Sequence, residues 1–245
     1  MRFTAWKTVL ACVVFLAATA GAADKIQALI ITGDDVGPHP WKETSAATTE
    51  ILTKSGKFDV KVVEGFDVLK DKAELAKYDE IIFMIFNAKK VAVTDEQKQN
   101  LYAYVKDGKG FVVTHLCSAT FGTDPEWAKL CGRYWVFGKS GHGKRVPFQC
   151  KVADKADPIT KGIEPFEADD ELYAKLLGED KIHVLIEADS DFSKKTEPLM
   201  FTLEYGKGRV FHNAFGHDGK ALKNPALEKL MVRGYEWAAK GKVSD

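Results

Sequence analysis

The sequence predicts one α/β domain built on a mainly parallel sheet. Short apolar runs rich in branched residues alternate with helical segments, and each strand-helix unit takes roughly 20–30 residues. The runs are almost continuously apolar, as in strands buried on both faces. The chain has 245 residues, of which 45% are hydrophobic and 29% charged. This is the balance of an ordinary globular protein, so the composition excludes disorder and low complexity.

The first half of the chain shows the alternation most clearly. Strands are predicted at 25–32, 58–63, 80–86 and 110–114, and helices at 43–54 and 95–107. Thr94 and Gln97 have the spacing of a capping box, in which each side chain satisfies a free backbone N–H of the helix start. Gly56 follows the first helix, where a left-handed C-cap favours glycine.

The second half predicts a less regular extension of the sheet. Strands are expected at 148–152, 181–188, 198–205 and 209–215, and a final helix at 225–240. The last two strands flank Gly206-Lys207-Gly208 and form a C-terminal hairpin. The final helix carries its apolar residues at the spacing of one buried stripe. No linker or repeat divides the chain.

Residues 1–23 are predicted to be a signal peptide. Arg2 and Lys7 form a basic start, an apolar run covers 9–18, and small residues occupy 20–22. The run is short for a membrane span, although an N-terminal anchor helix is the alternative. We therefore expect a periplasmic or secreted protein, with no stable membrane anchor after cleavage.

Cleavage leaves three cysteines, Cys117, Cys131 and Cys150. An odd number allows at most one disulfide and leaves a free thiol. An oxidising location is compatible with a Cys131–Cys150 bridge, but the sequence leaves the pairing open. Lys and Arg number 35, as do Asp and Glu. A neutral chain without a basic tract argues against a nucleic-acid partner.

Polar residues gather where the predicted strands end. In open parallel sheets, ligands bind at the C-terminal ends of the strands. The candidates there are Asp34, His39, Trp41, Asn87, His115, Cys117 and His217, with His142 in a Gly-rich segment. His183 and His212 lie within predicted strands, where a structural role is expected. By charge alone, the acidic segment 167–171 is predicted to be a solvated turn.

Five segments occur in an order typical of one protein family. They are GPHPW at 37–41, VVTHLCSA at 112–119, DPITKG at 157–162, DELY at 170–173, and YGKGRVF at 205–211 continued by FGH at 215–217. Together they resemble the ThuA-like (trehalose utilisation) family, a relative of class I glutamine amidotransferase domains. The resemblance implies a ThuA-like domain over 24–245, with a flavodoxin-like, mainly parallel sheet flanked by helices.

The resemblance also implies a set of site residues. Amidotransferase relatives carry a nucleophilic Cys on a sharp strand-to-helix elbow, and His115 takes that place here, which argues against glutaminase activity. What the family shares in this region is histidine and an acid. Carried over position by position, the candidates are His39, His115, His142, Glu171 and His217.

We assign these candidates provisional roles. The expected catalytic residues are His115, Glu171 and His217. The expected substrate-binding residues are Asp34, His39, Trp41 and Asn87. Imidazole and carboxylate groups suit a divalent metal such as Zn²⁺, for which His115, His142 and His217 are the predicted ligands.

Three functional hypotheses follow. The first is an exported enzyme of disaccharide or 3-keto-glycoside catabolism, a lyase, hydrolase or isomerase that acts on a small-molecule sugar by His/Glu acid-base chemistry. The second is a non-catalytic sugar-binding or complex-forming module that has lost the amidotransferase Cys. The third is a cysteine hydrolase or amidotransferase that uses Cys117. A homo-oligomer is compatible with each of them.

Overall fold

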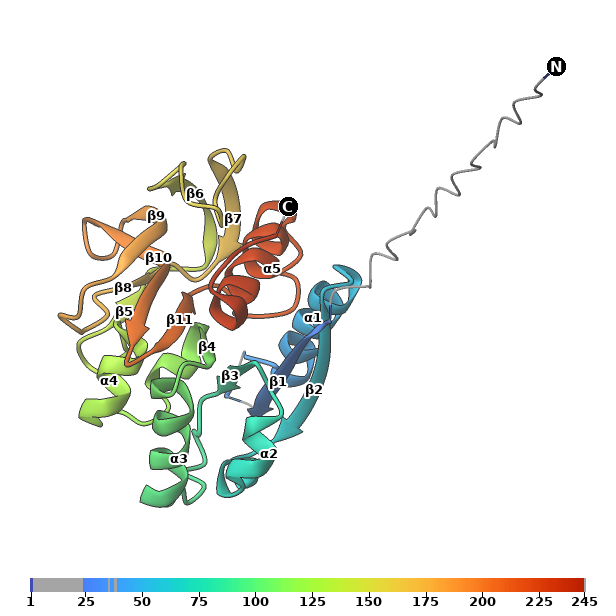
Figure 1. Cartoon of the computed structure of the whole chain (residues 1–245). Helices are drawn as coiled ribbons and strands as arrows, with labels where there is room; N and C mark the ends of the chain where they lie inside the picture. Colours follow the sequence, from blue (N-terminus) through green and yellow to red (C-terminus); the bar gives the residue numbers. More distant parts are fainter. Residues whose placement is uncertain (2–23, 35, 38, 245) are drawn as a thin grey trace.

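A nine-stranded mixed sheet forms the centre of the protein (Figure 1). The structure, a computed structural model, describes residues 1, 24–34, 36–37 and 39–244. The predicted signal peptide therefore lies, apart from Met1, outside the described residues. The strand order is β2-β1-β3-β4-β11-β10-β9-β6-β7. Among the described residues, no helix is both long and apolar enough to cross a membrane.

The first five strands of this order are parallel. They are β2 (Phe58–Glu64), β1 (Ile26–Gly33), β3 (Glu80–Ile85), β4 (Gly110–Thr114) and β11 (Gly208–Asn213). This is the 2-1-3-4-5 order of a flavodoxin-like sheet, with β11 as the fifth strand. The predicted fold class is confirmed.

The remaining strands extend the sheet in antiparallel fashion. They are β10 (Lys195–Tyr205), β9 (His183–Ser190), β6 (Val146–Val152) and β7 (Phe166–Asp170). The predicted hairpin is β10 and β11, so it joins the two parts of the sheet. A separate two-stranded sheet pairs β5 (Gly141–His142) with β8 (Tyr173–Ala174). This small sheet was not predicted from the sequence.

Helices cover both faces of the sheet (Figure 1). The helices α1 (Trp41–Lys54) and α5 (Pro225–Lys240) pack on one face. The other face is covered by the 3₁₀ helix η1 (Asp67–Lys70) with α2 (Lys72–Ala76), α3 (Asp95–Lys106) and α4 (Pro125–Cys131). Successive side chains of β1 point to opposite faces of the sheet. Ile30 belongs to the core cluster under α1 and α5, whereas Leu29 and Ile31 belong to the cluster on the α3 side.

Local sequence determines where α3 and α5 begin and end, and a glycine determines how closely α5 packs on the sheet. The predicted capping box of Thr94 and Gln97 is present at the start of α3. Helix α5 begins after Asn224, whose side chain accepts two backbone N–H groups, and ends at the left-handed Gly241. Within α5, a Cβ added at Gly234 would lie 2.4 Å from the ring of Phe211. Glycine therefore lets α5 pack closely on β11.

Two sequence interpretations are corrected. The segment 167–171 is not a solvated turn, because β7 pairs with β6 and ends at the fully buried Asp170. Charge alone misled here, since the carboxylate of Asp170 accepts hydrogen bonds from backbone N–H groups of distant loops. The Cys131–Cys150 bridge is also absent. Both thiols are free and buried, and they lie in core clusters on opposite faces of the sheet.

Glu80 at the start of β3 supplies a test of the core. Its carboxyl group is fully buried, neither oxygen has a hydrogen-bond partner among the described residues, and burial raises its pKa well above the usual value. The folded protein therefore keeps a proton that the unfolded chain releases, and stability falls as pH rises from the ordinary pKa toward the raised one.

We expect Glu80→Gln to raise the melting temperature relative to the wild type, with a gap that widens as pH rises. The limiting slope in this window is about 1.4 kcal/mol per pH unit. Thermal unfolding of both proteins from pH 5 to 8 measures the gap, and Glu50→Gln is the control, because Glu50 is an exposed carboxylate on α1. A gap that is constant with pH would contradict a buried, protonated Glu80.

Candidate functional site

Four side chains from distant parts of the chain meet at the C-terminal edge of the parallel strands. His39 lies in the loop after β1, His115 follows β4, His217 lies in the loop after β11, and Glu171 follows β7. One nitrogen of each imidazole and one oxygen of Glu171 all lie within 4.8 Å of one another. The sheet topology therefore gathers groups that are far apart in sequence.

Glu171 is the centre of this cluster. Its Oε2 lies 3.4 Å from Nε2 of His39 and 3.5 Å from Nε2 of His115. Its Oε1 lies 3.2 Å from Nδ1 of His217 and 3.5 Å from Nε2 of His142. The Glu171 side chain is only 8% exposed, whereas His142 is 33% exposed. His142 thus stands at the open side of a buried carboxylate.

The backbone of His115 is strained. Strand β4 ends at Thr114, and His115 opens the 3₁₀ helix η2 (His115–Ala119) with a φ of 46°. This left-handed region is costly for a residue with a Cβ. The sharp turn aims the imidazole into the cluster, and Nδ1 of His115 donates a hydrogen bond to the carbonyl oxygen of Ala214 at 2.7 Å.

Backbone carbonyl groups fix the protons of three imidazoles. Nδ1 of His39 lies 3.2 Å from the carbonyl oxygen of Val36, and Nδ1 of His142 lies 2.7 Å from that of Gly143. Nδ1 of His115 has the same kind of partner in the carbonyl oxygen of Ala214. Because a carbonyl oxygen only accepts, each Nδ1 carries the proton, and Nε2 of the neutral ring is bare.

These bare nitrogens face the carboxylate of Glu171, which is also an acceptor. Two acceptors at 3.4–3.5 Å need a cation between them, either a proton on Nε2 or a metal ion. A histidine whose other nitrogen donates to a carbonyl group is the usual arrangement of a metal ligand. The four residues are therefore arranged so that they could hold a cation.

The charges of the cluster are coupled. Burial alone would raise the pKa of Glu171, but hydrogen bonds that His115, His217 and His39 donate to it in their protonated forms hold this pKa well below its usual range. The same carboxylate raises the pKa of His217. Beneath them, burial raises the pKa of Asp170, whose oxygens accept the backbone N–H groups of Gly216 and His217. Glu171 is thus the ionised group.

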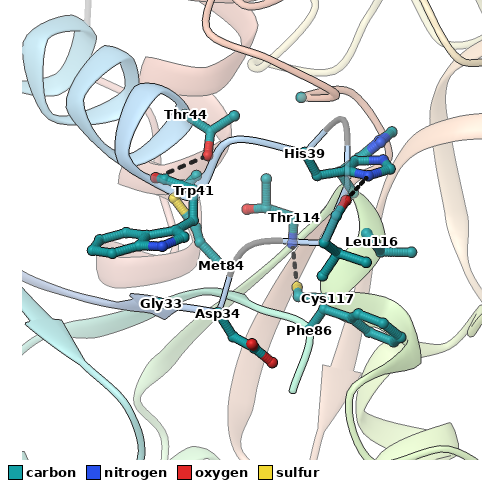
Figure 2. Close-up of a pocket in the computed structure, with 13 residues that line it drawn as sticks. Gly33, Asp34, His39, Trp41, Thr44, Met84, Phe86, Thr114, Leu116 and Cys117 are labelled. Carbon is teal, nitrogen blue, oxygen red and sulfur yellow. Dashed lines mark hydrogen bonds between the residues drawn. The ribbon is translucent and has the colours of Figure 1, made fainter. Parts of the chain in front are cut away.

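A small open pocket, with a volume of about 40 Å³, adjoins the imidazoles of His39 and His115. Its walls are mainly apolar side chains, among them Trp41, Phe86 and Leu116. Figure 2 shows the indole of Trp41 and the ring of Phe86 on opposite sides of this pocket. An apolar wall with a few convergent polar groups is the usual form of a small-molecule site.

A family model for ThuA, described as trehalose utilisation, matches residues 27–238. The chain belongs to the ThuA family. It is therefore a trehalose-utilisation-related protein with the flavodoxin-like fold that its sequence predicts. No curated protein matches the sequence.

Solved structures agree with the ThuA assignment. A ThuA-like protein from Parabacteroides merdae is 28% identical, with a TM-score of 0.76 over 91% of this chain and 92% of its own. One from Bacteroides uniformis is 19% identical, with a TM-score of 0.69 over 92% and 98%. The β-galactosidase from Bacillus circulans sp. alkalophilus is 12% identical, with a TM-score of 0.60 over 88% of this chain and 31% of its own, and shares the fold alone.

The structure of this ThuA protein brings together most of the predicted site residues, in a somewhat different grouping. The four-residue cluster contains His39, which was predicted to bind substrate, in place of His142, which was predicted as a metal ligand. His142 lies beside it, at the same carboxylate. His115, Glu171 and His217, the predicted catalytic residues, are members of the cluster.

The predicted substrate residues divide into two groups. Trp41 and Asp34 line the pocket, but Asp34 accepts the backbone N–H of Lys89 at 2.9 Å and lies 3.4 Å from its Nζ. In Figure 2 its carboxylate points away from His39. Asn87 donates to the carbonyl oxygen of Val91 and is outside the described pocket lining. Asp34 and Asn87 therefore shape the loops around the pocket.

Tyr173 is a further residue of the site that the sequence pattern did not predict. Its hydroxyl lies 3.0 Å from Nε2 of His115, and the two rings are stacked with centroids 4.2 Å apart. Burial raises the pKa of Tyr173 well above its usual value, so the hydroxyl stays protonated and can donate to the bare Nε2 of His115 while no cation is bound there. Tyr173 stands two residues after Glu171 in the DELY segment, and this proximity was the one sequence feature that could have indicated its role in the site.

Cys117 lies under the pocket in a form unsuited to nucleophilic chemistry. Its thiol is 2% exposed and donates to the carbonyl oxygen of Phe83 at 2.7 Å, while the sulfur accepts the N–H of Thr114. Burial raises the pKa of the Cys117 thiol far above neutrality, whereas a reactive cysteine needs a depressed pKa and exposure.

We expect iodoacetamide at neutral pH to leave Cys117 unmodified in the folded protein, because the reagent reacts with an accessible thiolate. Peptide mass spectrometry after a one-hour incubation measures the modification of each cysteine. Unfolding in guanidinium before labelling is the control and should expose all three described thiols. Rapid alkylation of folded Cys117 would revive the cysteine-hydrolase hypothesis.

Proposed function

We propose that this ThuA protein is an exported enzyme that acts on a disaccharide or 3-keto-glycoside by His/Glu acid-base chemistry assisted by a divalent metal ion. One observation carries the proposal: imidazoles with protons fixed on Nδ1 turn bare Nε2 atoms toward the ionised Glu171. The family supports a role in trehalose utilisation, and the predicted signal peptide supports export.

The donor set fits a borderline metal such as Zn²⁺. His39, His115, His217 and Glu171 offer three nitrogens and a carboxylate, the ligands that Zn²⁺ and related ions prefer. Glu171 lies 3.2–3.5 Å from a nitrogen of each of the three imidazoles, through Oε2 to His39 and His115 and through Oε1 to His217. One donor atom from each of the four residues lies within 4.8 Å of the others, so these residues would hold the ion.

The proposed chemistry begins with a proton next to a ketone. The C2 proton of a 3-keto sugar is acidified by the C3 carbonyl group, and a bound metal ion would supply electrophilic stabilisation of the oxygen on which charge develops. His142 is the most exposed imidazole around Glu171 and lies outside the four-residue cluster, so its Nε2 is the nitrogen that would take the C2 proton.

The electron pair left at C2 has two outcomes. It expels the substituent at C1, whose leaving oxygen then receives the proton from the His142 imidazolium. Alternatively, C3 of the enediolate takes the proton from the imidazolium while the C2 hydroxyl proton passes to the C3 oxygen, which gives the 2-keto isomer. The protonated hydroxyl of Tyr173 can donate to a substrate oxygen. Trp41 and Phe86 supply apolar walls against the sugar ring.

Elemental analysis joined to steady-state kinetics tests this proposal. We expect about one divalent metal ion per chain in the purified protein, lost in His115→Ala, and turnover of 3-keto-glucosides by the metal-replete protein. The corresponding plain glycosides serve as the comparison substrates. No turnover of either class would overturn the proposal. Binding of intact disaccharides unaffected by His115→Ala would instead favour the non-catalytic module.

A further inference from the structure

An exposed aromatic ring stands beside the pocket without a role in the chemistry above. Phe137 lies in the turn before β5 and is 65% exposed. Its ring centroid lies 5.6 Å from that of Phe86, which lines the pocket, and 6.1 Å from that of Trp135. The ring of Trp135 in turn lies 6.0 Å from that of His142. A row of rings thus continues from the pocket to the surface.

The turn that carries Phe137 is held in place by hydrogen bonds. The N–H groups of Lys139 and Ser140 donate to the carbonyl oxygen of Val136, and the N–H of Val136 donates to Oγ of Ser140. Ser140 Oγ also donates to the carbonyl oxygen of Lys175, next to β8. The exposed ring is therefore presented by an ordered turn, which lowers the entropy cost of binding a ligand.

The small exposed area of Phe137 favours a small-molecule ligand over a protein partner. Phe137 is followed by the exposed residues Gly138 and Lys139, so its apolar surface is that of about one ring. A stable protein interface needs on the order of 1,000 Å². A single flat ring at the mouth of a small-molecule pocket matches a single ring of a ligand.

We infer that Phe137 and Phe86 form a second subsite, which binds the ring attached to the reacting sugar. The occupant is a ring substituent with an apolar face, a second pyranose or an aryl group, that stacks on Phe137 while the first sugar lies near Glu171. This inference rests on the proposed function, because it assumes that the pocket binds a sugar. Face-to-face contact with an aromatic ring buries the C–H surface of such a substituent.

Binding of unreactive ligands tests the subsite separately from catalysis. The probes are methyl and phenyl glucosides, whose binding to the metal-replete protein is measured by calorimetry. The methyl and phenyl compounds are compared within the α series and, separately, within the β series. In the wild type we expect the phenyl glucoside to bind at least about tenfold more tightly, which corresponds to about 1.4 kcal/mol. Phe137→Ala should bring this ratio close to one, and Phe137→Trp should preserve it.

Phe192→Ala is the matched control, because Phe192 is 44% exposed and contacts Lys175 on another loop. It should leave the ratio unchanged. Equal binding of the two probes by the wild type, or a ratio that survives Phe137→Ala, overturns the subsite while turnover of 3-keto-glucosides still upholds the proposed function. Failure of all sugars to bind and to react overturns both. A change in oligomeric state on Phe137→Ala, measured by light scattering, would assign the ring to a contact between copies and overturn the subsite.

Discussion

Replacing Glu171 with Gln is expected to remove the metal ion and nearly all catalytic turnover. The substitution keeps the size of the side chain but removes the ionised group on which four imidazoles converge. An amide N–H₂ can donate to the bare Nε2 atoms, so the cluster no longer needs a cation. We expect the metal content to fall below about a tenth of the wild-type value and turnover by at least about 10²-fold.

Metal analysis and steady-state kinetics on the same preparations measure both effects. Glu167→Gln is the matched control, since Glu167 is an exposed carboxylate on β7, four residues away. Histidine titration by NMR adds a readout that does not depend on metal. In the metal-free variant, the pKa of His217 should return toward its ordinary value, because Glu171 is the main cause of its elevation. Wild-type metal content in Glu171→Gln would exclude the carboxylate as a ligand.

The fold was predictable because its signals are local. Continuous apolar strands such as β1 and β3, the capping box at Thr94 and the final stripe of α5 each depend on neighbouring residues. The expectation that ligands lie at the C-terminal strand ends also placed His39, His115 and His217 at one edge before any contact was known.

The acid at the centre of the cluster was harder to find, because its environment is made by distant segments. Glu171 lies in an acidic run that charge alone assigns to solvent, and only the family resemblance marked it. Its burial depends on β7 pairing with β6 and on Asp170 accepting the N–H groups of Gly216 and His217. Tyr173 was missed for the same reason, since its partner His115 is 58 residues away.

The strain at His115 links stability to the site. A residue with a Cβ at a φ of 46° costs about 1–2 kcal/mol relative to glycine, so the imidazole is present at a position that favours Gly. Strain of this kind persists only where the surrounding structure holds it, and it concentrates at functional sites. A role for the imidazole in the site explains why a strained residue occupies the turn.

Comparison of His115→Gly with His115→Ala separates the two contributions. Both variants lack the imidazole, so both are expected to lose the metal ion and at least about 10²-fold in turnover. In urea unfolding, however, the Gly variant should be more stable than the Ala variant by about 1 kcal/mol.

The control is a position where Ala is more stabilising than Gly, as is usual inside a helix. At Ala46, an exposed position in the middle of α1, the change to Gly should destabilise the protein by about 1 kcal/mol. The preference thus reverses between the two positions. If the Ala variant at position 115 were as stable as the Gly variant, the left-handed turn would relax when the imidazole is removed. The site, rather than the backbone, would then be what imposes the turn.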